Sequence, residues 1–116
     1  MISKINKAEK YKRIAFWISF GIVNTIIIAL SYNKIALTMI LLGMMAIIGL
    51  MKGNSRINTA IFISAAIIGP VLELIGVSYG AWSYPIVNIW NIPSWLIILW
   101  GNTAIFFYNF GKEISE

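Results

Sequence analysis

Residues 57–80, INTAIFISAAIIGPVLELIGVSYG, decide how this chain folds. Nearly all of their side chains are apolar or small, and the only charged one is Glu73. A helix needs about 20 mostly apolar residues to cross a hydrocarbon core of about 30 Å. We therefore predict that this stretch is a membrane-spanning helix.

The composition of the whole chain supports the same class. Of its 116 residues, 59% are hydrophobic and 11% are charged, whereas soluble domains are nearer 45–50% apolar and about 25% charged. Cysteine, histidine and aspartate are absent from the sequence. This excludes disulfides, the usual thiolate and imidazole metal sites and a Ser-His-Asp triad. We expect an integral membrane protein with no metal and no cofactor.

Three further apolar segments flank the first one. They cover residues 13–31, 35–51 and 93–111, and each has the length of a spanning helix. Their apolar runs are continuous and lack the alternation of barrel strands. The fold class predicted for residues 1–116 is therefore all-α: one polytopic domain, a four-helix transmembrane bundle. Residues 1–12 would be a basic tail, and residues 81–92 an aromatic external loop.

The segment nearest the N-terminus, residues 13–31, has an alternative interpretation. A basic start, an apolar run and the small residues near Ala29-Leu30-Ser31 also resemble a cleavable signal peptide. The apolar run is longer than the roughly 7–15 residues of a typical signal core. We expect the segment to be retained, and cleavage remains the alternative.

The basic residues orient the predicted bundle. Eight of the nine fall on one side: Lys4, Lys7, Lys10, Lys12, Arg13, Lys52, Arg56 and Lys112. Lys34 alone falls on the other side. By the positive-inside rule, both termini are cytoplasmic in a multi-pass protein of the cell membrane. With no basic patch elsewhere, the charges indicate contact with the lipid bilayer and its anionic lipids, and no nucleic-acid partner.

Small residues share a face of segment 57–80 with the acid. At 100° per residue, Ala65, Gly69, Glu73, Gly76 and Gly80 align. Small side chains let another backbone approach closely. We expect Gly69, Gly76 and Gly80 to face a neighbouring helix, a second copy or a partner membrane subunit. Glu73 would then face protein, because a charge facing lipid is expensive.

Two asparagines are candidates to meet Glu73. Asn24 is expected at nearly the same depth and Asn102 a few ångströms deeper. Trp95, Asn102 and Asn109 are spaced by seven and share a helix face. We predict a cluster of Asn24, Glu73 and Asn102 in the outer half of the bundle. It could be purely structural, or a site in which Asn24 and Asn102 bind a ligand and Glu73 is catalytic.

The predicted external loop and its flanks are rich in aromatic residues: Trp82, Tyr84, Trp90, Trp95 and Trp100. Trp and Tyr at this density are typical of an interfacial belt. The alternative is an aromatic lid over Glu73, in which Trp82, Tyr84 and Trp95 bind substrate. Flat aromatic faces suit a polyene or isoprenoid chain and can stabilise a cation.

A resemblance appears in ELIGVSYGAWSYP (73–85) and NIPSWLIILWGNTAIFF (91–107). Together they resemble an acid–Gly–Trp–Tyr segment and the following Pro-led helix of membrane carotenoid-biosynthesis proteins of the lycopene-cyclase and hydratase type. The resemblance implies that Glu73 corresponds to the acid of that motif, with Trp82 and Tyr84 as the aromatics that follow it. The cyclase-type proteins carry further acids after a later proline, where this chain has Ser94. Residues 93–100 also resemble an uncharacterised bacterial inner-membrane family with a Pro-x-Trp…Leu-Trp helix.

Three functional hypotheses follow. The first is a protein that binds or modifies an isoprenoid- or carotenoid-like lipid at an outer-leaflet polar and aromatic site. The second is a non-catalytic subunit or scaffold in which Glu73 is a structural hydrogen-bonding group. The third is a dimeric minimal transporter that uses Glu73 as its proton site.

Overall fold

A computed structural model describes the backbone of residues 2–116 and the side chains of residues 7–116. It contains the helices α1 (Ile2–Ser31), α2 (Ile35–Met51), α3 (Ser55–Ser78) and α4 (Trp95–Ser115). Residues 2–116 form no strand beyond one isolated bridge between Ile89 and Ile92. The all-α prediction is confirmed.

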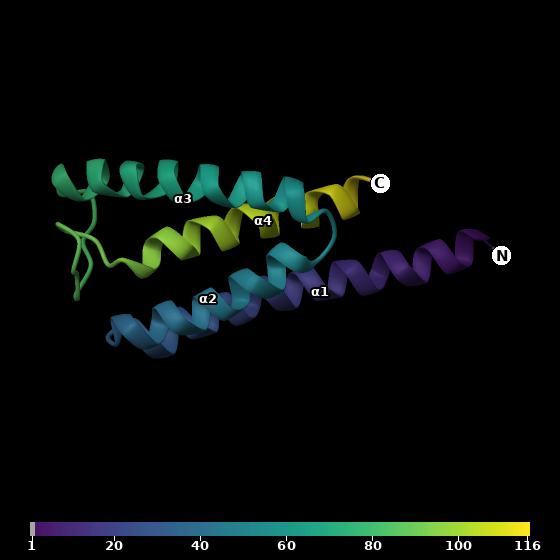
Figure 1. Ribbon diagram of the computed structural model, residues 1–116, viewed down its shortest axis with the longest axis horizontal. Coiled ribbons are helices and arrows are strands. Elements are labelled where there is room, and N and C mark those ends of the chain that lie inside the picture. Colours follow the sequence, from purple (N-terminus) through teal and green to yellow (C-terminus); the bar gives the residue numbers. More distant parts are fainter. Residues whose placement is uncertain (1) are drawn as a thin grey trace.

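The four helices run lengthwise in a bundle of 55 × 24 × 23 Å. Both chain ends and the turn between α2 and α3 lie at one end of it, whereas the α1–α2 turn and residues 79–94 lie at the other (Figure 1). Helix α4 packs against all three other helices. Within the described part of the chain, α1 and α3 do not contact each other. Helix α4 is therefore the centre of the bundle.

Two of the helices, α1 over Lys7–Ser31 and α3, are long and apolar enough to cross a membrane. Helix α2 is apolar but has only 17 residues. Much of the apolar surface faces outward, and Ile40, Ile47, Ile63 and Ile67 are each more than half exposed. Soluble monomers rarely expose large contiguous apolar patches. The surface thus indicates membrane association.

Helix boundaries agree with the prediction for α2 and differ elsewhere. Residues 2–12, predicted as a tail, continue α1, and α4 covers residues 95–115 instead of 93–111. Helix α3 ends at Ser78 because Gly80 takes a positive φ of 76°. The Ala81 N–H then bonds the Gly76 carbonyl at 2.9 Å, and the Gly80 N–H bonds the Val77 carbonyl at 3.0 Å. This is a Schellman ending, which favours glycine because other residues resist that φ.

Buried side chains form two core clusters along α4. One joins Trp17 and Phe20 of α1 to Ile105, and the other joins Leu42 of α2 to Trp95 and Leu96. Both clusters use α4, which explains its central position. They fix the register in which polar groups on α1, α2 and α4 meet.

Candidate functional site

Glu73 holds the loop between α3 and α4, residues 79–94, against α3. Its Oε2 accepts hydrogen bonds from Trp82 Nε1 and from the Tyr84 hydroxyl, both at 2.7 Å. Gly76, nearly one turn further along α3, makes room for the Trp82 ring, since a Cβ there would lie 2.1 Å from Trp82 Cη2. Glu73 and Gly76 together therefore fix the position of the Trp82 ring.

Burial raises the pKa of the Tyr84 phenol well above its ordinary value, and the hydrogen bond and charge of Glu73 raise it further. The Trp82 side chain opposes this shift. Burial and a nearby anion both disfavour a phenolate. Tyr84 is therefore a neutral donor to Glu73 across the physiological pH range.

Trp95 packs against Tyr84, on which the hydrogen bond to Glu73 depends. Its ring meets the Tyr84 ring edge to face, with centroids 6.1 Å apart and an interplanar angle of 88°. Trp95 is only 4% exposed and packs with the α2 cluster. Its Nε1 has no hydrogen-bond partner among the described residues. Trp95 belongs to the core under the loop, whereas Trp82 lies on the surface.

Asn24 and Asn102 form a separate amide pair. Asn102 Nδ2 donates to Asn24 Oδ1 at 2.8 Å and to the Leu42 carbonyl at 3.0 Å. Asn24 Nδ2 donates to the Phe20 carbonyl at 2.7 Å. Both side chains are buried, and the Asn102 Oδ1 atom has no partner within the described chain. The pair ties α1, α2 and α4 together but leaves one acceptor free.

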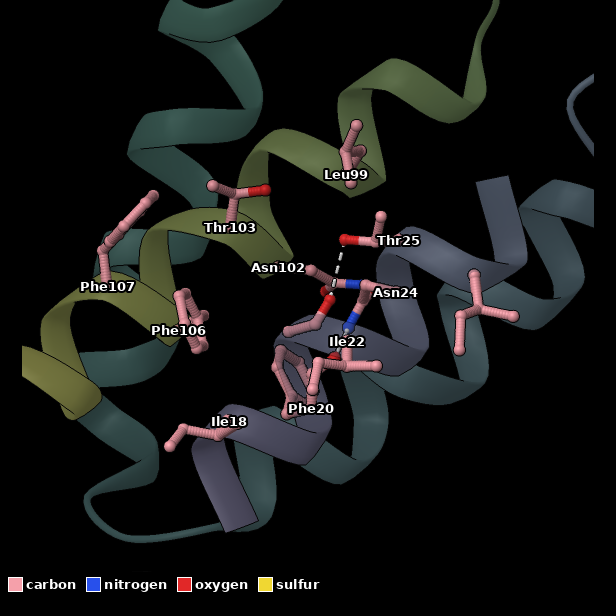
Figure 2. Close-up of a pocket in the computed structure, with 12 residues that line it drawn as sticks. Ile18, Phe20, Ile22, Asn24, Thr25, Leu99, Asn102, Thr103, Phe106 and Phe107 are labelled. Atoms are coloured by element: carbon pink, nitrogen blue, oxygen red, sulfur yellow. Dashed lines mark hydrogen bonds between the residues drawn. The ribbon is translucent and has the colours of Figure 1, made fainter. Parts of the chain in front are cut away.

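The amide pair lies in the wall of a groove between α1 and α4 (Figure 2). The groove has a volume of about 440 Å³. Aromatic rings and aliphatic side chains make up most of its lining, and four polar side chains interrupt it. These are Asn24, Thr25, Asn102 and Thr103, with Phe20, Phe106 and Phe107 as the aromatic residues.

The predicted cluster of Asn24, Glu73 and Asn102 does not form, and that prediction is wrong. Helix α4 lies between the helices that carry Asn24 and Glu73, and its Trp100 covers Gly69 on α3. Asn102 is two residues beyond Trp100, about 200° around the helix, and so points toward α1 and α2. The helix order separates the acid from the amides.

The predicted glycine face is correct in part. Gly69 does face a neighbouring helix, because a Cβ there would lie 2.0 Å from the Trp100 ring. Gly76 faces Trp82 of the loop instead of another helix. Gly80 lies outside α3, and a Cβ there would meet nothing within 4 Å. Its role is to end the helix, which corrects its assignment to a helix interface.

Asn109 and Asn58 form a second amide pair, and no partner for Asn109 was predicted from the sequence. Asn109 Nδ2 donates to Asn58 Oδ1 at 2.9 Å, and Asn58 Nδ2 donates to the Lys52 carbonyl at 2.7 Å. The spacing by seven of Trp95, Asn102 and Asn109 was the available signal for a shared face, and the structure shows that all three are buried. Among the described side chains, no three His, Cys, Asp or Glu residues gather where they could hold a metal ion.

Comparison with known proteins found no matching family model, no matching curated protein and no matching solved structure.

Proposed function

We propose that this chain is a multi-pass membrane protein that binds an isoprenoid-like lipid, with the apolar chain of the lipid in the α1–α4 groove. All four helices would cross the cell membrane, with both termini in the cytoplasm. Helix α2 is about 25 Å long at 1.5 Å per residue and α4 is somewhat longer. The gathering of eight basic residues toward the end of the bundle where both termini lie supports the orientation.

The observation that carries the lipid proposal is the polar wall of the groove. A buried acceptor without a partner costs about 1–3 kcal/mol, and Asn102 Oδ1 is such an acceptor among the described residues. Asn102 is only 1% exposed and its Nδ2 group is bonded to Asn24 and to the Leu42 carbonyl. To reach this acceptor, a hydroxyl group on a bound isoprenoid would have to turn the amide and replace one of those two bonds. Phe106 and Phe107 offer flat apolar faces to the rest of the ligand, and Phe20 lies buried behind the groove.

Glu73 supports a second candidate function, that of a non-catalytic scaffold. Both donors to its carboxyl group come from the protein itself, so the group already has a structural role in closing the outer loop. Its Oε1 accepts no hydrogen bond among the described residues and would be the atom available for chemistry. The likeness to carotenoid-biosynthesis proteins, with Glu73 as the acid, stays a prediction.

Lipid analysis tests the proposal. The protein would be purified in a mild detergent and its co-purifying lipids identified by mass spectrometry. Thr103→Trp fills the groove, whereas Ile47→Trp places the same ring on the 60% exposed outer face of α2. We expect an isoprenoid-type lipid with the parent and with Ile47→Trp, and at least a tenfold loss with Thr103→Trp. Equal retention by both variants, or only bulk phospholipid in all three, would contradict the proposal and favour the scaffold.

A further inference from the structure

A second pocket lies at the end of the bundle that carries both termini. It has a volume of about 320 Å³ and brings together basic side chains from three separate parts of the chain: Arg13 of α1, Lys52 of the α2–α3 turn and Lys112 of α4. None of these parts is adjacent to another in sequence. The tertiary structure therefore makes a basic site that no single motif encodes.

All three cations lie at the boundary of an apolar stretch. Arg13 directly precedes the apolar part of α1, Lys52 directly follows Met51, and Lys112 follows Phe110 and Gly111. In a membrane-spanning bundle this boundary is the level of the lipid headgroups. In the proposed topology, the pocket would therefore open at the level of the phosphates of the cytoplasmic leaflet.

Two of the cations are held in place by neighbours. Arg13 Nε donates to Glu113 Oε2 at 2.6 Å, while its Nη groups make no hydrogen bond with the described residues. The Lys52 ammonium lies 4.9 Å from the centre of the Phe16 ring. Glu113, with its side chain only 10% exposed, thus aims the guanidinium and leaves its outer edge free. A free guanidinium edge matches the geometry of a phosphate.

Within the described chain, the turn beside Lys52 leaves two peptide N–H groups unbonded next to the pocket. Gly53 and Asn54 line the pocket, Gly53 has a φ of 79°, and α3 begins directly afterwards. Their peptide N–H groups make no hydrogen bond among the described residues. Unpaired N–H groups before a helix N-terminus favour anions. Glu113 and Glu116 also line the pocket, so its three cations exceed its two side-chain anions by one.

We propose that this pocket binds the phosphate of an anionic phospholipid headgroup in the cytoplasmic leaflet. The inference rests on the proposed membrane topology and not on the lipid groove between α1 and α4. Basic pockets between spanning helices on the cytoplasmic side suit such headgroups. The site would tie α1, α4 and the α2–α3 turn together at the membrane surface.

The test measures lipid binding by the full-length protein in a maltoside detergent. Phosphatidylglycerol and phosphatidylcholine are titrated in native mass spectrometry, and Trp fluorescence melting gives a second readout. Lys112→Gln removes one pocket cation, and Lys34→Gln, at the opposite end of the bundle, is the matched control. We expect phosphatidylglycerol to bind more tightly than phosphatidylcholine. Its affinity should fall about fivefold in Lys112→Gln and stay unchanged in Lys34→Gln.

Other outcomes would overturn the proposal. Equal loss in both variants would mean general charge attraction, and no loss in Lys112→Gln would mean that the pocket is not used. If millimolar inorganic phosphate displaced phosphatidylglycerol completely, the pocket would be a site for soluble anions and not for lipid. At position 52 the variant is Lys52→Arg, because Lys52→Gln would also remove the contact with Phe16. Lys52→Arg keeps the charge and should bind phosphatidylglycerol within twofold of the parent. These phosphatidylglycerol results do not depend on whether the α1–α4 groove binds an isoprenoid, so the two proposals can fail separately.

Discussion

The pairing of Asn24 with Asn102 can be tested by a double-mutant cycle in which each residue is changed to alanine. Asn102 Nδ2 lies 2.8 Å from Asn24 Oδ1, and both side chains are at most 5% exposed. Either single change leaves a buried group without its partner, at about 1–3 kcal/mol. Polar pairs between helices in membranes couple by about 0.6 kcal/mol on average and at most about 1.7 kcal/mol. Because this bond is short and fully buried, we expect coupling near the upper end.

The assay is reversible unfolding in mixed detergent micelles, followed by Trp fluorescence. The control cycle combines Asn24→Ala with Asn109→Ala, which lies seven residues, about 10 Å, further along α4. Asn109 bonds Asn58 and not Asn24, so these two changes should add within about 0.5 kcal/mol. Coupling near zero for Asn24 and Asn102, or equal coupling in both cycles, would refute the pairing.

Three further predictions concern the two ends of the bundle. Reporter fusions at residue 54 and at the end of the chain should read cytoplasmic and one at residue 88 external; a cytoplasmic signal at 88 would refute the four-crossing topology. Gly76→Leu should displace the Trp82 ring and lower stability by about 1–3 kcal/mol in detergent melting, whereas Ile75→Leu, at a 52% exposed position, should change it little; equal tolerance would contradict the packing. Because the Tyr84 pKa is raised in the folded state, its contribution to stability is complete below the ordinary tyrosine pKa of about 10 and is lost as pH rises through the folded-state pKa. Tyr84→Phe should remove the last-ionising phenol from an absorbance titration at alkaline pH, and an unchanged titration would refute this.

Much of the architecture could be predicted from the sequence, because it depends on properties that run along the chain. Apolar run length gave four helices, with α2 placed at its observed limits. The spacing by seven of Trp95, Asn102 and Asn109 predicted that they share a helix face, and all three are buried in the structure. The end of α3 was also encoded locally, since Gly80 is the residue that a Schellman ending favours.

Only the tertiary structure decided which polar groups meet. Residue counting gives the depth of a group along a helix axis, but its lateral neighbours depend on helix order, which no local pattern specifies. Helix α4 lies between α1 and α3, so Glu73 turned to Trp82 and Tyr84 while Asn102 turned to Asn24. The same packing joined Arg13, Lys52 and Lys112 into one pocket. The sequence alone determined the four helices, the limits of α2 and the side that is basic, because those are local or summed properties. The limits of the other helices differ from the prediction, and the sites arise from contacts between distant residues.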